Sequence, residues 1–279
     1  KNETVFCSVP LSHVPFLDLL GPVSRAGFEA LSMTPSHVEE LERQGLTAAD
    51  ARQRLADHGL RVAEFECIAH WLPGQAALFD RVAGYGDHLL AMTPDYVLPM
   101  AAAVGARSVA VVDMFRPALE TDALAEAFAG ICDKASQYGL RVNIEFLPMG
   151  SIANIAQTAE IIRRAGRPNG GITLDTLHFY RGGSTLADLR ALPAEMIGMV
   201  QLSDARASTT DDIETEMMTG RALPGEGKLD VRAVAELLAA KGVTAPIGVE
   251  VFSQASAENE VETTARSWMG ALRSITGRA

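Results

Sequence analysis

Short apolar runs rich in β-branched residues alternate along the chain with longer stretches whose apolar residues recur at helical spacing. The short runs predict eight strands: Thr4–Ser8, Gly27–Met33, Arg61–Cys67, Ser108–Val112, Arg141–Phe146, Gly171–Asp175, Ile197–Leu202 and Ile247–Val251. The longer stretches predict amphipathic helices, for example Thr47–His58, Thr121–Tyr138, Ile152–Ala165 and Val231–Lys241. Strict alternation of this kind is typical of an α/β protein with parallel strands.

The junctions between these elements favour a closed barrel. Helical stretches run into Gly59, Gly139 and Gly242 just before the next strand, where glycine ends a helix at little conformational cost. No Gly-rich phosphate-binding turn follows the first strand, which disfavours a doubly wound sheet. A (β/α)8 TIM barrel takes about 250 residues in one domain. We therefore expect residues 1–279 to form a single TIM-barrel domain.

Two segments exceed ordinary loop length, and both follow the C-terminal end of a predicted strand. They are Pro73–Asp87 and Ala205–Gly227. Active sites of TIM barrels lie at the C-terminal ends of the strands, so these segments are expected to cover or wall the site.

Composition and charge narrow the function. The formal charge of -11 and the lack of a basic stripe argue against nucleic-acid binding. Cys7, Cys67 and Cys132 form no Cys-x-x-Cys pair and are expected to be free thiols in a reducing cytosol. The opening Lys-Asn-Glu-Thr shows no targeting pattern, and no apolar run approaches the ~20 residues of a spanning helix. The expectation is a cytoplasmic protein that acts on a small molecule.

Four oxygen-bearing side chains end the last four predicted strands: Glu145, Asp175, Gln201 and Glu250. A single acid in a strand is more often an exterior or ion-paired residue. Four in succession are not expected to serve four separate structural roles, since burying unpaired charge costs several kcal/mol. One divalent cation can offset that cost. Three carboxylates and a carboxamide suit Mn²⁺ or Mg²⁺, with Co²⁺ and Zn²⁺ as alternatives.

Five motifs make the sequence resemble the sugar phosphate isomerase/epimerase family, the xylose isomerase-like barrels. They are Ile-Glu-Phe-Leu-Pro, Leu-Asp-Thr-Leu-His, Val-Gln-Leu-Ser-Asp-Ala, Leu-Pro-Gly-Glu-Gly-Lys-Leu-Asp and Val-Glu-Val-Phe, all between residues 141 and 252. The resemblance implies metal binding by Glu145, Asp175 and Glu250. It also implies substrate contacts for His178 and for Arg221, which precedes the Pro-Gly-Glu-Gly turn.

Gln201 departs from the commonest pattern, in which a histidine stands in the seventh strand. The glutamine resembles the 3-dehydroshikimate dehydratase branch, where the amide oxygen is a metal ligand, although other isomerase-like members share it. Asp204 is expected to position Gln201 or an arginine.

Further substrate-binding candidates rest on position alone. Arg206 and Arg221 lie in the long segment after the seventh strand, where each could bind an anionic group or be an ordinary solvated arginine. His70 and Trp71 follow the third strand, where they could wall the pocket. His178 could instead cap a helix or orient Asp175.

The resulting hypothesis is a metal-dependent isomerase or epimerase of a sugar, keto-sugar or cyclitol-like substrate, working through an enediolate. Glu145, Glu250 and His178 are its catalytic candidates. A dehydratase of the 3-dehydroshikimate type is the main alternative. A barrel-type endonuclease is disfavoured by the few histidines and the acidic charge, and a metabolite-binding barrel without activity remains as the non-enzymatic reading. Barrels of this family commonly form homo-oligomers.

Overall fold

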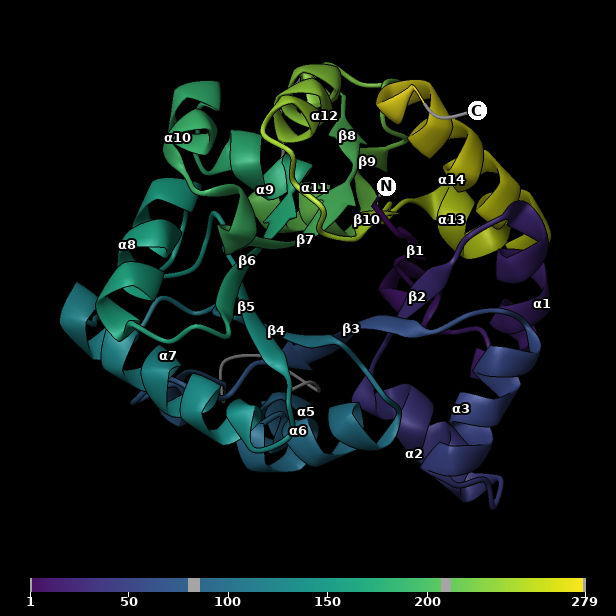
Figure 1. Ribbon diagram of the computed structural model, residues 1–279, viewed down its shortest axis with the longest axis horizontal. Helices are drawn as coiled ribbons and strands as arrows, with labels where there is room; N and C mark the ends of the chain where they lie inside the picture. Colours follow the sequence, from purple (N-terminus) through teal and green to yellow (C-terminus); the bar gives the residue numbers. More distant parts are fainter. Residues whose placement is uncertain (1, 80–85, 207–211, 278–279) are drawn as a thin grey trace.

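The computed structural model describes residues 2–79, 86–206 and 212–277, and within them eight parallel strands close a barrel. The strands form a ring in Figure 1, in the order β1-β10-β7-β6-β5-β4-β3-β2. Their bounds are β1 Thr4–Phe6, β2 Ala30–Met33, β3 Val62–Ile68, β4 Ser108–Val112, β5 Arg141–Glu145, β6 Gly170–Asp175, β7 Ile197–Leu202 and β10 Ile247–Val249. The predicted TIM barrel is confirmed.

Helices surround this ring, as Figure 1 shows. Those between β1 and β5 are η1 Val9–Leu11, α1 Phe16–Ala26, α2 Pro35–Arg43, α3 Ala48–Asp57, α4 Ala76–Phe79, α5 Gly86–Ala91, α6 Pro94–Ala103 and α7 Thr121–Ser136. Those after β5 are α8 Ile155–Ala165, α9 Thr176–Arg181, α10 Leu186–Ala191, η2 Ala194–Met196, α11 Ile213–Thr219, α12 Val231–Ala240, α13 Gln254–Glu258 and α14 Val261–Thr276. No helix in the described ranges combines the length and apolar character needed to cross a bilayer.

The two ends of the chain meet to complete the barrel. The first strand pairs with the last, Val5 lying opposite Gly248, and helix α14 packs against α1. Phe6 of β1 stacks on Trp268 of α14, with ring centroids 4.7 Å apart. Both side chains are buried, so this aromatic contact seals the seam between the first and last units.

The strand prediction differs from the structure mainly at one start. The second strand begins at Ala30 and not at Gly27, because Gly27 ends helix α1 in the left-handed conformation with φ of 96°. The segments predicted as long loops contain elements of their own. Helix α4 lies in the first segment and α5 begins at its end. The second contains α11 and β9 Arg221–Ala222, and it begins within β8 Asp204–Ala205, with which β9 forms an antiparallel ribbon. Parts of both segments lie outside the described residues.

Candidate active site

The four predicted oxygen donors all lie at the C-terminal ends of strands. Glu145 ends β5, Asp175 ends β6, Gln201 lies near the end of β7, and Glu250 follows β10. The register places Gln201 beside Asp175 on one side and Gly248 on the other, so neighbouring strands carry these groups to one mouth. All four side chains are buried. Their common location agrees with the sequence-based expectation.

Asp175 is held by the start of helix α9 and by an arginine. Its Oδ1 accepts hydrogen bonds from the backbone N–H groups of Leu177 (2.6 Å) and His178 (3.1 Å). Its Oδ2 accepts a bond of 2.5 Å from Nη1 of Arg221. The aspartate therefore caps the helix that carries His178, which fixes the backbone of that histidine over the mouth.

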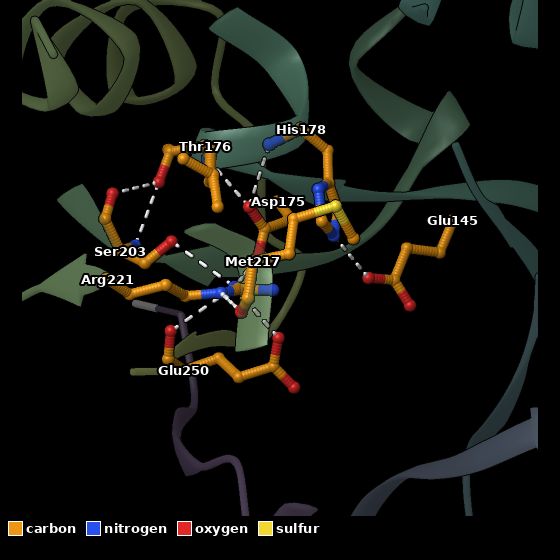
Figure 2. A network of polar contacts seen from close by, with 9 residues as sticks. Glu145, Asp175, Thr176, His178, Ser203, Met217, Arg221 and Glu250 are labelled. Atoms are coloured by element: carbon orange, nitrogen blue, oxygen red, sulfur yellow. Dashed lines mark hydrogen bonds and ion pairs between the residues drawn. The ribbon is translucent and has the colours of Figure 1, made fainter. Parts of the chain in front are cut away.

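Arg221 of β9 lies between two of the predicted ligands, as Figure 2 shows. Its Nη1 also lies 3.1 Å from Oε2 of Glu250, and its Nε donates to the carbonyl of Met217 at 2.9 Å. The guanidinium carbon lies 4.9 Å from the centroid of the Phe252 ring. The sequence suggested a substrate clamp or a solvated loop arginine. The structure places Arg221 in the interior, paired with the protein's own carboxylates.

The charges at the mouth shift the ionisation of these groups. Burial pushes the pKa of Asp175 upward, but the charges of Arg221 and His178 outweigh it and hold the pKa below its usual value. Burial raises the pKa of Glu250 well above its usual range despite Arg221, and the charge of Glu145 adds to the rise. One arginine therefore does not neutralise the acids gathered here.

His178 points toward Glu145 in Figure 2, with its Nε2 3.3 Å from Oε1 of the glutamate. The ring is buried, and its Nδ1 has no hydrogen-bond partner among the described residues. One ligand atom each from Glu145, Asp175 and His178 lie within 4.8 Å of one another, which is close enough to share a metal ion. The histidine is thus a ligand candidate as well as the predicted substrate contact.

Gln201 provides the sharpest test of whether a metal fits. Its side chain is completely buried, and neither Oε1 nor Nε2 has a hydrogen-bond partner among the described residues. A buried amide without partners costs roughly 1–3 kcal/mol. An amide oxygen beside three carboxylates is a donor set that hard divalent cations take. These residues therefore fit a divalent cation.

One acidic residue of the site, Glu66, and the buried acid one layer below it, Glu64, escaped the sequence analysis. Glu64 and Glu66 of β3 are both buried in the barrel interior. Oε1 of Glu66 has no partner among the described residues, and burial together with the charges of Glu250 and Glu145 raises its pKa well above the usual range. The signal was present in the run Val-Ala-Glu-Phe-Glu-Cys-Ile, where spacing of two puts both glutamates on one face of a strand.

Each of the two aromatic candidates after β3 makes a side-chain hydrogen bond to a backbone carbonyl. His70 is half-buried, its Nδ1 lies 3.0 Å from the carbonyl of Leu90, and Trp71 donates from Nε1 to the carbonyl of Val112 at 2.7 Å. These contacts fix both rings beside the mouth, and their roles toward substrate stay predictions.

Within the described residues, no hydrogen bond or ion pair joins Asp204 to Gln201 or to an arginine. Its carboxylate accepts from the backbone N–H groups of Gly225 (3.1 Å) and Leu229 (2.9 Å), so it holds the Pro-Gly-Glu-Gly turn. Arg206 is exposed and lines a separate cavity of 620 Å³ between β9, α13 and α14. None of the four predicted ligands lines that cavity, although Arg221 does. The structure therefore does not bring Arg206 together with the acids of the mouth.

Comparisons with known proteins agree with this architecture. The chain is 31% identical over 137 residues to an inosose isomerase of Halalkalibacterium halodurans, covering 46% of this chain and 47% of the isomerase. It is 26% identical over 239 residues to a 3-dehydroshikimate dehydratase of Pseudomonas aeruginosa, covering 84% of this chain and 36% of the dehydratase. The matches thus span about half of the isomerase and about a third of the dehydratase.

Solved structures and family models give the same fold. A crystal structure of IOLI protein with a bound zinc atom superposes with a TM-score of 0.84, at 16% identity and covering 99% of this chain and 98% of that chain. The model of the xylose isomerase-like TIM barrel family matches residues 20–273. With the closed barrel and the acids at its mouth, this match shows that the chain belongs to the xylose isomerase-like TIM barrel family.

Proposed function

We propose that this protein is a metal-dependent isomerase or epimerase acting on a sugar, keto-sugar or cyclitol-like substrate. One observation carries the proposal: the unpaired amide of Gln201 lies buried at the mouth that also holds Glu145, Asp175 and His178. The inosose isomerase relative supports a polyhydroxylated ketone as the substrate class.

Glu145, Asp175, Gln201 and Glu250 would hold the cation, and His178 lies close enough to replace one of them. An all-oxygen set favours Mn²⁺ or Mg²⁺, whereas a histidine ligand favours Zn²⁺ or Co²⁺. Bound there, a divalent ion supplies Lewis-acid polarisation of a substrate carbonyl, which acidifies the neighbouring C–H.

The chain's own residues would move the protons. Glu250, whose pKa burial raises well above its usual range, would accept and carry a proton, and Glu145 faces the mouth from β5. Removal of a carbon-bound proton by one glutamate, and delivery of a different proton by the other glutamate to the opposite face of the same carbon, gives epimerisation. Return to the adjacent carbon gives aldose–ketose isomerisation. His178, 3.3 Å from Glu145, would hold that carboxylate and donate a hydrogen bond to a substrate oxygen.

A dehydratase of the 3-dehydroshikimate type is the second candidate. It is favoured by the glutamine at position 201 and by the alignment of 239 residues with the dehydratase of Pseudomonas aeruginosa. The same proton removal followed by loss of a β-hydroxyl would give dehydration. The two proposed activities differ in whether the substrate carries a β-hydroxyl placed to leave after the proton is removed.

The deciding experiment incubates the purified protein with Mn²⁺ in D2O and follows a panel of inososes and keto-sugars by NMR. We expect deuterium at a carbon next to the carbonyl and a new isomer, and both should disappear after exhaustive chelation and return with Mn²⁺. A parallel sample receives 3-dehydroshikimate and is followed by the ultraviolet absorbance of protocatechuate. Full turnover of any substrate after chelation would exclude the metal, and protocatechuate formation without deuterium exchange into the panel would replace the isomerase by the dehydratase.

A further inference from the structure

The third strand carries a second acidic side chain toward the mouth. Side chains two residues apart on a strand point to the same face, so Glu66 lies on the same inner face as Glu64 and one layer nearer the C-terminal end of β3. The pairing of β3 with β4 is irregular between Phe65 and Ile68. Such irregularities re-aim side chains and are frequent next to active sites.

The two glutamates differ in their partners. Glu64 accepts hydrogen bonds from Asn143, Thr173 and Ser108, at 2.7 to 3.0 Å from its Oε1. Glu66 is only 7% exposed, yet its Oε1 has no partner among the described residues. A hydrogen bond from the hydroxyl of Ser32 partly offsets the rise that burial causes in the pKa of Glu66, and the same hydroxyl accepts from the N–H of Ser8 at 2.8 Å. Oε1 is the oxygen of Glu66 that stays without a donor in the described part of the chain. A buried carboxylate oxygen without a donor is expected to meet one in a complex.

The strand order places Glu66 across the barrel from Gln201. Between β3 and β7 lie β4, β5 and β6 on one side and β2, β1 and β10 on the other, so the two strands are opposite each other. The charges of Glu250 and Glu145 both raise the pKa of Glu66, which places these carboxylates within electrostatic reach of one another. A ligand held at the β5–β10 side would therefore present its far edge to Glu66.

The acidic charge around the barrel interior limits which chemical groups a ligand can turn toward Glu66. Glu64, Glu66, Glu145 and Glu250 surround the interior, and an anionic group turned toward Glu66 would be repelled. An uncharged hydroxyl donates a hydrogen bond to a carboxylate without that penalty, and bonds to charged groups are the stronger ones.

We propose that Glu66 is a further substrate-binding residue, whose Oε1 accepts a hydrogen bond from a ring hydroxyl on the edge of the substrate away from Gln201. The inference rests on the proposed function and adds a specificity device to it. Glu66 selects uncharged cyclitols and sugars over ligands that direct a carboxylate toward β3.

The test measures binding by calorimetry on the Mn²⁺-loaded protein, with myo-inositol as an unreactive probe. Glu66→Leu should weaken the affinity for myo-inositol by roughly tenfold, because a buried hydrogen bond to the Glu66 carboxyl group is lost. Its affinity for Mn²⁺ should stay within about threefold of wild type, since Glu66 is not a proposed ligand. The matched control is Glu64→Gln, which should bind myo-inositol as tightly as wild type.

Glu66→Gln keeps the shape of the side chain and serves if the leucine variant does not fold. It should lose less affinity than the leucine variant, because the amide oxygen can still accept a hydrogen bond from the hydroxyl. Across the monodeoxy inositols, wild type should lose affinity for the one that lacks the contacted hydroxyl, and that loss should shrink in Glu66→Gln. Unchanged myo-inositol affinity in both Glu66 variants, or a parallel fall in Mn²⁺ affinity, overturns this inference alone. Failure of the Mn²⁺-loaded wild type to bind any inositol, inosose or keto-sugar of the panel overturns the proposed function as well.

Discussion

The barrel interior contains two polar layers, which differ in whether their buried side chains have hydrogen-bond partners. In the lower layer, the carboxylate of Glu64 is surrounded by Asn143, Thr173 and Ser108, and each of them donates a hydrogen bond to it. In the upper layer, the amide of Gln201 is equally buried and has no partner among the described residues. Satisfied polar groups specify the packing of a core, whereas unsatisfied ones indicate a binding partner.

The layers also differ in charge. Burial raises the pKa of Glu64 to about 7, and its three hydrogen bonds limit the rise. At the mouth, mutual repulsion adds to burial, and the pKa values of Glu250 and Glu66 both lie well above the usual range. The lower layer is therefore complete by itself, and the upper one would gain most from added positive charge. This contrast leads to four predictions.

The largest effect is expected at Glu250. Glu250→Gln keeps the shape of the side chain but removes the proposed proton carrier, which is also a proposed metal ligand, so kcat/KM should fall roughly 10⁴-fold. Steady-state kinetics on the substrate identified by NMR measures this, with circular dichroism to confirm folding. The control is the same substitution at the exposed Glu258 of α13, which should keep full activity. Activity within tenfold of wild type in Glu250→Gln would remove this residue from the mechanism.

Arg221 should stabilise the metal-free protein most. Arg221→Met leaves Asp175 and Glu250 buried without their shared cation, which should cost about 3–5 kcal/mol of unfolding free energy. Denaturant unfolding with and without Mn²⁺ measures the loss. Added Mn²⁺ should restore more stability to the variant than to wild type, because the ion supplies the missing charge. Equal gains in the two proteins would contradict a shared role of arginine and metal.

Glu64 should make stability depend on pH. Its pKa is about 7 in the folded protein against 4.5 for an ordinary glutamate, so the folded state holds a proton that the unfolded chain releases. The protonated Glu64 carboxyl therefore contributes fully to the free energy of unfolding below pH ~4.5. That contribution is lost as the pH rises to about 7, a change of about 3 kcal/mol. Glu64→Gln should therefore gain in melting temperature relative to wild type between pH 5 and pH 8. Parallel melting curves across that range would disprove the shift.

The smallest effect is expected at Gln201. Gln201→Leu removes two unpaired buried atoms, so the metal-free protein should be stabilised by about 1–3 kcal/mol and melt a few degrees higher. The variant should also bind Mn²⁺ at least tenfold more weakly, as measured by calorimetry. A stabilised variant with unchanged Mn²⁺ affinity would show that the amide is not a ligand.

Sequence patterns predicted the barrel because parallel strands and helices leave periodic signatures. The eight predicted strands match the barrel strands, with the largest shift at Gly27, where a helix end was taken for the start of a strand. The same periodicity placed Glu145, Asp175 and Glu250 at strand ends. The spacing of Glu64 and Glu66 carried equal information, but attention to strand ends alone missed both.

Side-chain partners were harder to predict, because they depend on segments that approach only in the folded chain. Arg221 pairs with carboxylates from β6 and from the end of β10 after the ribbon turns it inward, and no local pattern encodes that turn. Asp204 holds backbone N–H groups of a turn more than twenty residues away, a role that its sequence neighbours do not reveal.

The hydrogen bonds from the backbone N–H groups of Gly225 and Leu229 to Asp204 affect how this barrel can change over evolutionary time. The ribbon pairs Asp204 with Ala222 and Ala205 with Arg221, and Lys228 donates from its backbone to Ala205 at 2.8 Å. Backbone hydrogen bonds therefore hold together the two ends of the segment that follows Ala205. Lengthening a tied loop costs little, about 0.6 kcal/mol for each doubling. Insertions in this segment can change the walls of the site while the ion pairs of Arg221 stay in place. We therefore expect substrate specificity to change without changes in the barrel itself.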